Sequence, residues 1–187
     1  MILIAGLGNG DVKYHNTRHN AGYFGLETLK VALRYEGFRA SYTYKYDKYA
    51  RSDLVRFKWG RKEEIILQRF RGFMNESGRY IKKVYDDNDA NVLILFHDDL
   101  DLKLGEFKIQ QGKSPHGHKG VKSVEEYMGT KDFLRVRIGI ENRGDKKIPG
   151  EKYVLERFTK EEITILRETL IVACEELLLT DIFEKWI

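Results

Sequence analysis

The sequence contains a histidine whose surroundings suit acid–base chemistry. His19 lies in the segment NTRHNAG, between an arginine and an asparagine, just before an apolar run typical of a helix. Imidazole titrates near neutral pH and can take a proton from water, provided that a partner fixes its tautomer. The segment FHDDLD follows a strand-like run and offers Asp98 as such a partner. Whether the two side chains meet depends on the elements that carry them.

Two short apolar runs should form the centre of a sheet. MILIAG at the start of the chain and NVLILF before Asp98 have the composition of strands that are buried on both faces. More exposed strand patterns occupy residues 45–60, 63–70, 105–112 and 133–141. Helical patterns occupy residues 20–37, 75–87, 118–129 and 159–187, and the last begins with Thr159 and Glu162 at capping-box spacing. About six strands alternating with helices predict an α/β domain of three layers, with a twisted mixed β-sheet flanked by helices.

Composition predicts one domain in a reducing compartment. The 187 residues allow one sizeable core, so we expect a single domain over residues 1–187. Cys174 is the only cysteine, which excludes an internal disulfide and is typical of a buried helix position. No run approaches the roughly 20 apolar residues of a membrane helix. We therefore expect a cytoplasmic protein without membrane insertion, and a monomer, since no sustained heptad pattern asks for a partner.

The expected topology gives a test for the histidine. In open α/β sheets the functional crevice lies at the carboxyl ends of the parallel strands. If the first strand and the NVLILF strand are parallel neighbours, Asn9 and the loop that leads to His19 face Asp98. Asp98 would then accept the Nδ1 hydrogen of His19 and leave Nε2 free as a base. The alternative for Asp98 is a carboxylate that only caps its loop.

Two further segments carry groups that reach substrates. In RGFMNESG, Asn75 precedes a helix, where its amide can present a donor and an acceptor together or act as the N-cap. The glycine-bearing loop GKSPHGHKG holds Lys113, His116, His118 and Lys119, and its backbone N–H groups could bind an oxyanion or a phosphate.

Several kinds of chemistry are not expected. His116 and His118 have no familiar zinc-ligand spacing, so we expect no metal. Asp11 occupies the place of the third glycine of a dinucleotide fingerprint, so we expect no nucleotide cofactor. The chain has no G-x-S-x-G elbow and no P-loop. A base without a protein nucleophile favours catalysis by activated water.

Several motifs taken together resemble the bacterial-type peptidyl-tRNA hydrolase family. They cover nearly the whole chain in the family's order: LIAGLGNGDVKYHNTRHNAG, GFMNESG, FHDDLDLKLGEFK, GHKGVKS, LRVRIGI and YVLERFTKEE. The resemblance implies a single α/β globule that hydrolyses the ester between a peptide and the 3′ end of tRNA, without a cofactor. It implies that His19 is the general base, that Asp98 orients it, and that Asn9 helps to recognise an N-blocked aminoacyl group. It further implies that Tyr14, Phe73 and Asn75 line the site that binds the tRNA end and the peptide backbone.

The chain departs from the family pattern beside the base. The family usually has GGHNG where this chain has HGHKG, so Lys119 stands in the place of an asparagine. A cation there should lower the pKa of His19, or it could bind a phosphate. Gln110 stands where a basic residue is often found. We therefore hypothesise that an RNA-facing patch consists of Lys108, Lys113, Lys119 and Arg137; the alternative is that these are ordinary solvated side chains.

The rival function is a non-catalytic RNA-binding factor of the same fold. The formal net charge of +4 suits an RNA partner in either case. A pure binding module needs neither a base nor an orienting carboxylate, whereas this chain retains His19, Asp98, Asn9 and Asn75 together. The sequence therefore favours the enzyme.

Overall fold

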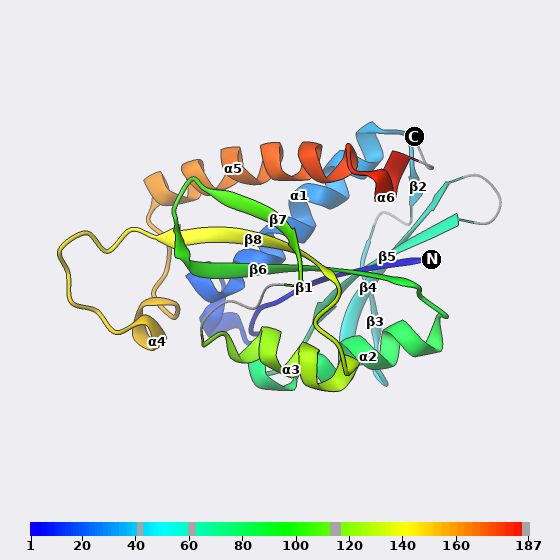
Figure 1. Cartoon of the computed structure of the whole chain (residues 1–187), viewed down its shortest axis with the longest axis horizontal. Coiled ribbons are helices and arrows are strands. Elements are labelled where there is room, and N and C mark those ends of the chain that lie inside the picture. Colours follow the sequence, from blue (N-terminus) through cyan, green and yellow to red (C-terminus); the bar gives the residue numbers. More distant parts are fainter. Residues whose placement is uncertain (41–42, 60–62, 113–116, 185–187) are drawn as a thin grey trace.

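A mixed β-sheet forms the middle layer of the protein. The computed structural model describes residues 1–40, 43–59, 63–112 and 117–184. Within these residues the sheet has eight strands in the order β2-β4-β5-β1-β6-β8-β7, and β3 pairs with β4. Figure 1 shows α1 and α5 above the sheet and α2 and α3 below it. The expected α/β fold with three layers is confirmed.

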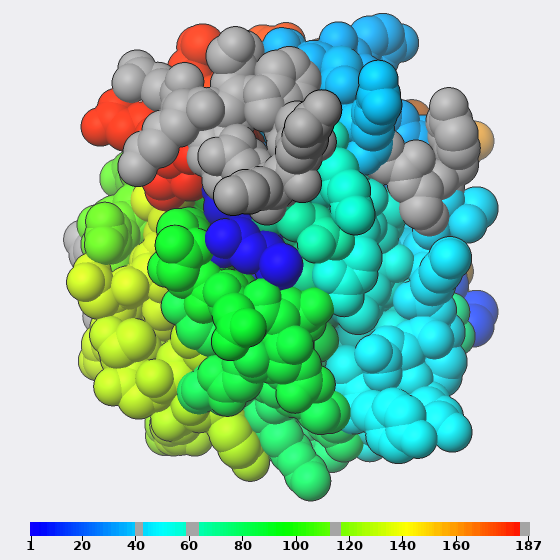
Figure 2. Space-filling view, turned by 90° about the vertical axis from the view of Figure 1, so that its right-hand side faces the viewer, coloured from blue at the N-terminus to red at the C-terminus, as the bar shows by residue number. Residues whose placement is uncertain are grey.

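The central strands are parallel neighbours, as predicted. β1 (Ile2–Gly6) pairs in parallel with both β5 (Glu63–Phe70) and β6 (Val92–Lys103). The register places Gly6, the last residue of β1, opposite Phe96 of β6. Asp98 follows Phe96 by two residues, so β6 carries it past the point where β1 ends. The carboxyl ends of the two strands therefore open at the same edge. Figure 2 shows the opposite face, at the amino ends of these strands, with the N-terminus in blue.

The outer strands extend this core on both sides. β4 (Ser52–Trp59) is antiparallel to β5, β8 (Leu134–Glu141) is parallel to β6, and β7 (Phe107–Gln111) is antiparallel to β8. The sheet has more strands than the expected six because residues 45–60 contain two of them. β3 (Lys45–Asp47) turns back into β4, and the Asp47 carboxylate accepts the backbone N–H of Tyr49 at 2.8 Å in that turn. The eighth strand, β2 (Arg39–Ala40), is very short.

Four long helices bury apolar residues on the two faces of the sheet. α1 (Ala21–Tyr35) and α5 (Lys160–Leu178) cover one face, and α2 (Ser77–Asp87) and α3 (Lys119–Met128) cover the other. The predicted capping box of Thr159 and Glu162 begins α5, and Cys174 is buried in that helix. Short helical turns complete the described chain: η1 (Val12–Tyr14), η2 (Arg18–Asn20), η3 (Met74–Glu76), α4 (Gly150–Tyr153) and α6 (Asp181–Glu184). No helix of the described residues is both long and apolar enough to cross a bilayer.

Candidate active site

His19 is held in place by the C-terminal part of the chain. The backbone N–H of Arg18 donates to the carbonyl of Glu156 at 3.0 Å, and that of His19 donates to Val154 at 2.8 Å. The Arg18 guanidinium donates to both carboxylate oxygens of Glu162, at 2.8 and 2.7 Å. Both side chains of this ion pair are more than 90% buried. Loss of one partner of a buried pair costs about 3–5 kcal/mol, so the segment that carries His19 is firmly anchored.

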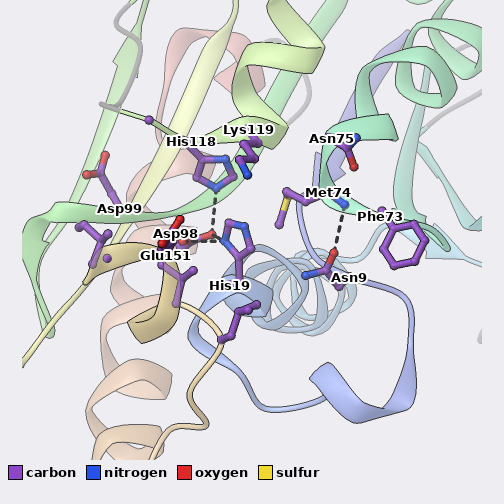
Figure 3. Close-up of a pocket in the computed structure, with 15 residues that line it drawn as sticks. Asn9, His19, Phe73, Met74, Asn75, Asp98, Asp99, His118, Lys119 and Glu151 are labelled. Atoms are coloured by element: carbon purple, nitrogen blue, oxygen red, sulfur yellow. Dashed lines mark hydrogen bonds and ion pairs between the residues drawn. The ribbon is translucent and has the colours of Figure 1, made fainter. Parts of the chain in front are cut away.

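The predicted contact between His19 and Asp98 is present. His19 Nδ1 lies 2.9 and 3.0 Å from the two carboxylate oxygens of Asp98, which is 2% exposed. An ionised carboxylate only accepts hydrogen bonds, so Nδ1 carries the hydrogen. In the neutral ring, Nε2 then has a free lone pair. Figure 3 shows the two side chains meeting at one side of a cavity.

A second histidine completes the surroundings of Asp98. His118 is the N-cap of α3, and its Nδ1 accepts the backbone N–H groups of Gly120 and Val121 at 3.2 and 3.3 Å. Because Nδ1 must be unprotonated to accept them, Nε2 carries the hydrogen and donates it to Asp98 Oδ1 at 2.9 Å. Both nitrogens of His118 are therefore occupied, which leaves His19 as the ring able to act as a base.

Sequence reasoning singled out His118 only as a loop residue and a poor zinc ligand. The contact with Asp98 depends on how the loop returns to the sheet, which no local pattern reports. One signal was available: His118 directly precedes the helix that starts at Lys119, where an acceptor side chain can cap the first N–H groups.

The electrostatics favour an ionised carboxylate and a basic imidazole. Burial opposes ionisation of Asp98, but His19 and His118 outweigh it and hold the pKa of the carboxyl well below its usual range. Burial also lowers the pKa of His19, whereas the charge and hydrogen bond of Asp98 raise it, and the net pKa is raised. Lys119 lowers this pKa, as predicted, but Asp98 has the larger influence. The predicted effect of the cation is therefore present, and Asp98 outweighs it.

The cavity beside His19 has a volume of about 440 Å³. Asn9 lies in its wall, and its Oδ1 accepts the backbone N–H of Met74 at 3.0 Å. Because its oxygen is occupied, Asn9 presents its NH2 group to the cavity (Figure 3). Phe73 lines the rim with 60% of its surface exposed, and Lys119 enters beside His118. Asn75 also lines the cavity and is not the N-cap of α2, because Glu76 takes that position.

Other predicted residues lie elsewhere. Tyr14 ends η1, outside the set of residues that line this cavity, and the ammonium group of Lys13 lies 4.9 Å from its ring centre. Lys108 is exposed on β7, at the sheet edge farthest from β4. Lys113 lies outside the described residues.

Arg137 does not belong to an exposed basic patch. It is 4% exposed, and its Nε donates to Asp99 Oδ2 at 2.7 Å while Nη1 donates to Gln110 at 2.9 Å. Its charge is therefore neutralised inside the protein, and the hypothesis that it faces RNA is wrong. Among the described residues, Lys108 and Lys119 are the members of the predicted patch that have exposed side chains.

The structure also brings together a set of groups able to hold a metal. His19, Asp98 and His118 offer ligand atoms within 4.8 Å of one another. At present these atoms face each other across N–H···O hydrogen bonds, so a cation would have to displace the shared hydrogens. Behind them, the ring of His97 lies 5.3 Å from that of His118, and burial lowers the pKa of His97 to about 3. Metal-free action stays a prediction with a direct test below.

A buried carboxylate that orients an imidazole beside an open cavity is an arrangement that hydrolases use for general-base catalysis. The sequence matches the peptidyl-tRNA hydrolase family over residues 3–185. It is 39% identical to a peptidyl-tRNA hydrolase of Campylobacter concisus over 187 residues, covering 98% of this chain and 93% of that protein. It is 35% identical to one of Oceanobacillus iheyensis, covering 100% and 92%. The crystal structure of the peptidyl-tRNA hydrolase of Acinetobacter baumannii superimposes with a TM-score of 0.80 at 25% identity, covering 96% of this chain and 87% of that one. The chain belongs to the peptidyl-tRNA hydrolase family.

Proposed function

We propose that the protein hydrolyses the ester between the peptide and the tRNA of peptidyl-tRNA in the cavity beside His19, with His19 as the general base. Membership of the family makes it an ester hydrolase of peptidyl-tRNA. The observation that carries the assignment of the base is the 2.9 Å contact of His19 Nδ1 with buried Asp98, which leaves Nε2 for water.

The reaction needs a proton acceptor, donors for the carbonyl oxygen and a proton for the leaving group. Water attacks the ester carbonyl while its proton passes to His19 Nε2, and Asp98 stabilises the imidazolium that forms. The NH2 group of Asn9 and the ammonium group of Lys119 are two donors in the cavity that can stabilise the developing oxyanion. The imidazolium then returns its proton to the departing ribose oxygen. The products are a peptide acid and a free tRNA.

The test is release of an N-acetylated aminoacyl group from tRNA by the wild-type protein, with and without a chelator. We expect the same turnover in both conditions. An intact ester together with tight tRNA binding would favour the non-catalytic binding factor instead. Loss of turnover in chelator alone would show that the His19, Asp98 and His118 cluster works with a metal.

The proposal includes action as a monomer in the cytoplasm, where translation produces peptidyl-tRNA. All the groups invoked come from one chain, so the site needs no second copy. Sedimentation of the protein at working concentration checks the monomer.

Lys119→Met should move the acid limb of the pH–rate profile to higher pH. Lys119 lowers the pKa of His19, so removal of its charge raises that pKa further. The base works only when deprotonated, so activity is lost as the pH falls through the pKa, and a higher pKa brings that loss at a higher pH. The measurement is kcat/KM of ester release against pH.

Lys119→Arg is the matched control, because it retains the cation and should keep the limb of the wild-type protein. If the acid limb of Lys119→Met coincides with that of the wild-type protein, Lys119 does not influence the pKa of His19.

A further inference from the structure

A basic and aromatic surface lies outside the cavity of the proposed reaction. It includes Lys45 and Tyr46 of β3, Lys48 and Tyr49 of the following turn, and Arg71 after β5, and we call it the β3 surface. A hollow of about 520 Å³ lies among the side chains of its first four members. In Figure 1 these elements lie at the β4 side of the sheet, and in Figure 2 the cyan segment that contains β3 forms the lower right margin of the molecule.

Its aromatic rings are exposed and each is paired with a cation. The Arg71 guanidinium lies 4.9 Å from the ring centre of Tyr46, and the Lys48 ammonium lies 4.9 Å from that of Tyr49. Tyr46 is 53% exposed and Tyr49 is 70% exposed. Exposed rings that can stack with bases, beside cations that can contact phosphates, are the combination that single-stranded nucleic acid binds.

The acidic groups nearby form ion pairs or hydrogen bonds within the protein. Asp53 is 2% exposed and pairs with Arg69 at 3.1 Å and with Arg71 at 2.7 Å. The Asp47 carboxylate accepts backbone N–H groups in its turn. Within the described parts of the chain, Lys45 and Lys48 have no ion pair, so their charges are available to a polyanion.

An ion pair bounds the β3 surface on one side, and the chain segment after β5 links it to the cavity on the other. At its far end, Arg56 is paired with Glu64 at 3.1 Å. At its near end, Arg71 stands two residues before Phe73, which lies on the rim of the cavity. A smaller hollow of about 220 Å³ is lined by Arg71 and by Gly10, the residue that follows Asn9 of the cavity wall. The β3 surface is therefore linked to the cavity through residues 71–73 of the chain.

We propose that the β3 surface binds RNA, namely unpaired nucleotides of the tRNA substrate close to the ester. Lys45 and Lys48 contact phosphates, and Tyr46 and Tyr49 each present a ring face to a base. The inference rests on the proposed function for the identity of the RNA. It assigns RNA contacts to the β3–β4 edge of the sheet, whereas Lys108 lies on β7 at the opposite edge.

The test is the affinity of deacylated tRNA for two double variants, measured at several salt concentrations. Tyr46→Ala with Tyr49→Ala should weaken binding by roughly 10-fold or more through lost stacking. Lys45→Gln with Lys48→Gln should reduce the slope of log affinity against log salt by about 1.4, for two phosphate contacts on a single strand. The matched control is Lys160→Gln with Arg167→Gln, which removes two exposed charges from α5 on another face.

Affinities and salt slopes of both double variants equal to those of the control, with unchanged melting temperatures, would overturn the proposal. Unchanged tRNA affinity with a KM that rises only for longer peptides would assign the surface to the peptide and would overturn it as well. Deacylated tRNA carries no ester, so this result is separate from hydrolysis. A wild-type protein that fails to release the N-acetylated aminoacyl group contradicts the proposed reaction, whatever the variants do to binding.

Discussion

His19→Ala should lower kcat for ester release by about 10²- to 10⁴-fold, the usual contribution of a general base. In the proposed reaction the variant loses the ring whose Nε2 takes the proton from water, and His118 cannot replace it because backbone N–H groups and Asp98 occupy both of its nitrogens. The measurement is single-turnover release of an N-acetylated aminoacyl group at saturating protein.

The contrast between kcat and binding makes this result specific. His19→Ala should bind deacylated tRNA about as tightly as the wild-type protein, since the lost group acts on the water. Turnover within a few-fold of wild type would refute the assignment of His19 as the base. His15→Ala is a suitable control, because His15 is an exposed histidine of the same loop that does not line the cavity.

Asp98→Asn should lower kcat by about 10⁴-fold, the scale seen when a catalytic histidine is held in the wrong tautomer. His118 Nδ1 accepts backbone N–H groups, so His118 Nε2 keeps its hydrogen and takes the amide oxygen of the new side chain. The amide NH2 then faces His19 Nδ1 and donates to it. The hydrogen of His19 moves to Nε2, and the lone pair that should accept a proton is lost.

Two measurements test this chain of events. Nitrogen NMR of His19 should show hydrogen on Nδ1 in the wild-type protein and on Nε2 in Asp98→Asn. Asp101→Asn removes one charge from the exposed end of the same strand and should leave kcat near the wild-type value. An Asp98→Asn protein with near-normal turnover would mean that Asp98 does not set the tautomer.

The sequence predicts the pairing of His19 with Asp98 because this contact depends on only a few features of the sequence. Two buried apolar runs identify parallel central strands, and polar residues after such strands share one edge of the sheet. The contact of Asp98 with His118 was not predictable in this way, because the residues are 20 positions apart and meet only through the path of a loop.

Arg137 and the outer strands show a different limit. Arg137 is a member of the predicted RNA-facing patch, but its side chain donates to Gln110 of β7, and Asp99 neutralises it. Which side chains of an outer strand are buried depends on how that strand pairs with its neighbours in the sheet. The break between β3 and β4 was missed for a similar reason, since a turn held by one carboxylate leaves little trace in the apolar pattern.

The anchoring of Arg18 by Glu162 bears on when this protein becomes competent during its own synthesis. While the ribosome is making it, the growing chain is itself a peptide esterified to tRNA. The segment that carries His19, the proposed base, gains these anchoring contacts only after residues 154–162 have been made. A partly synthesised copy without residues 154–162 therefore lacks the contacts that hold His19 in place.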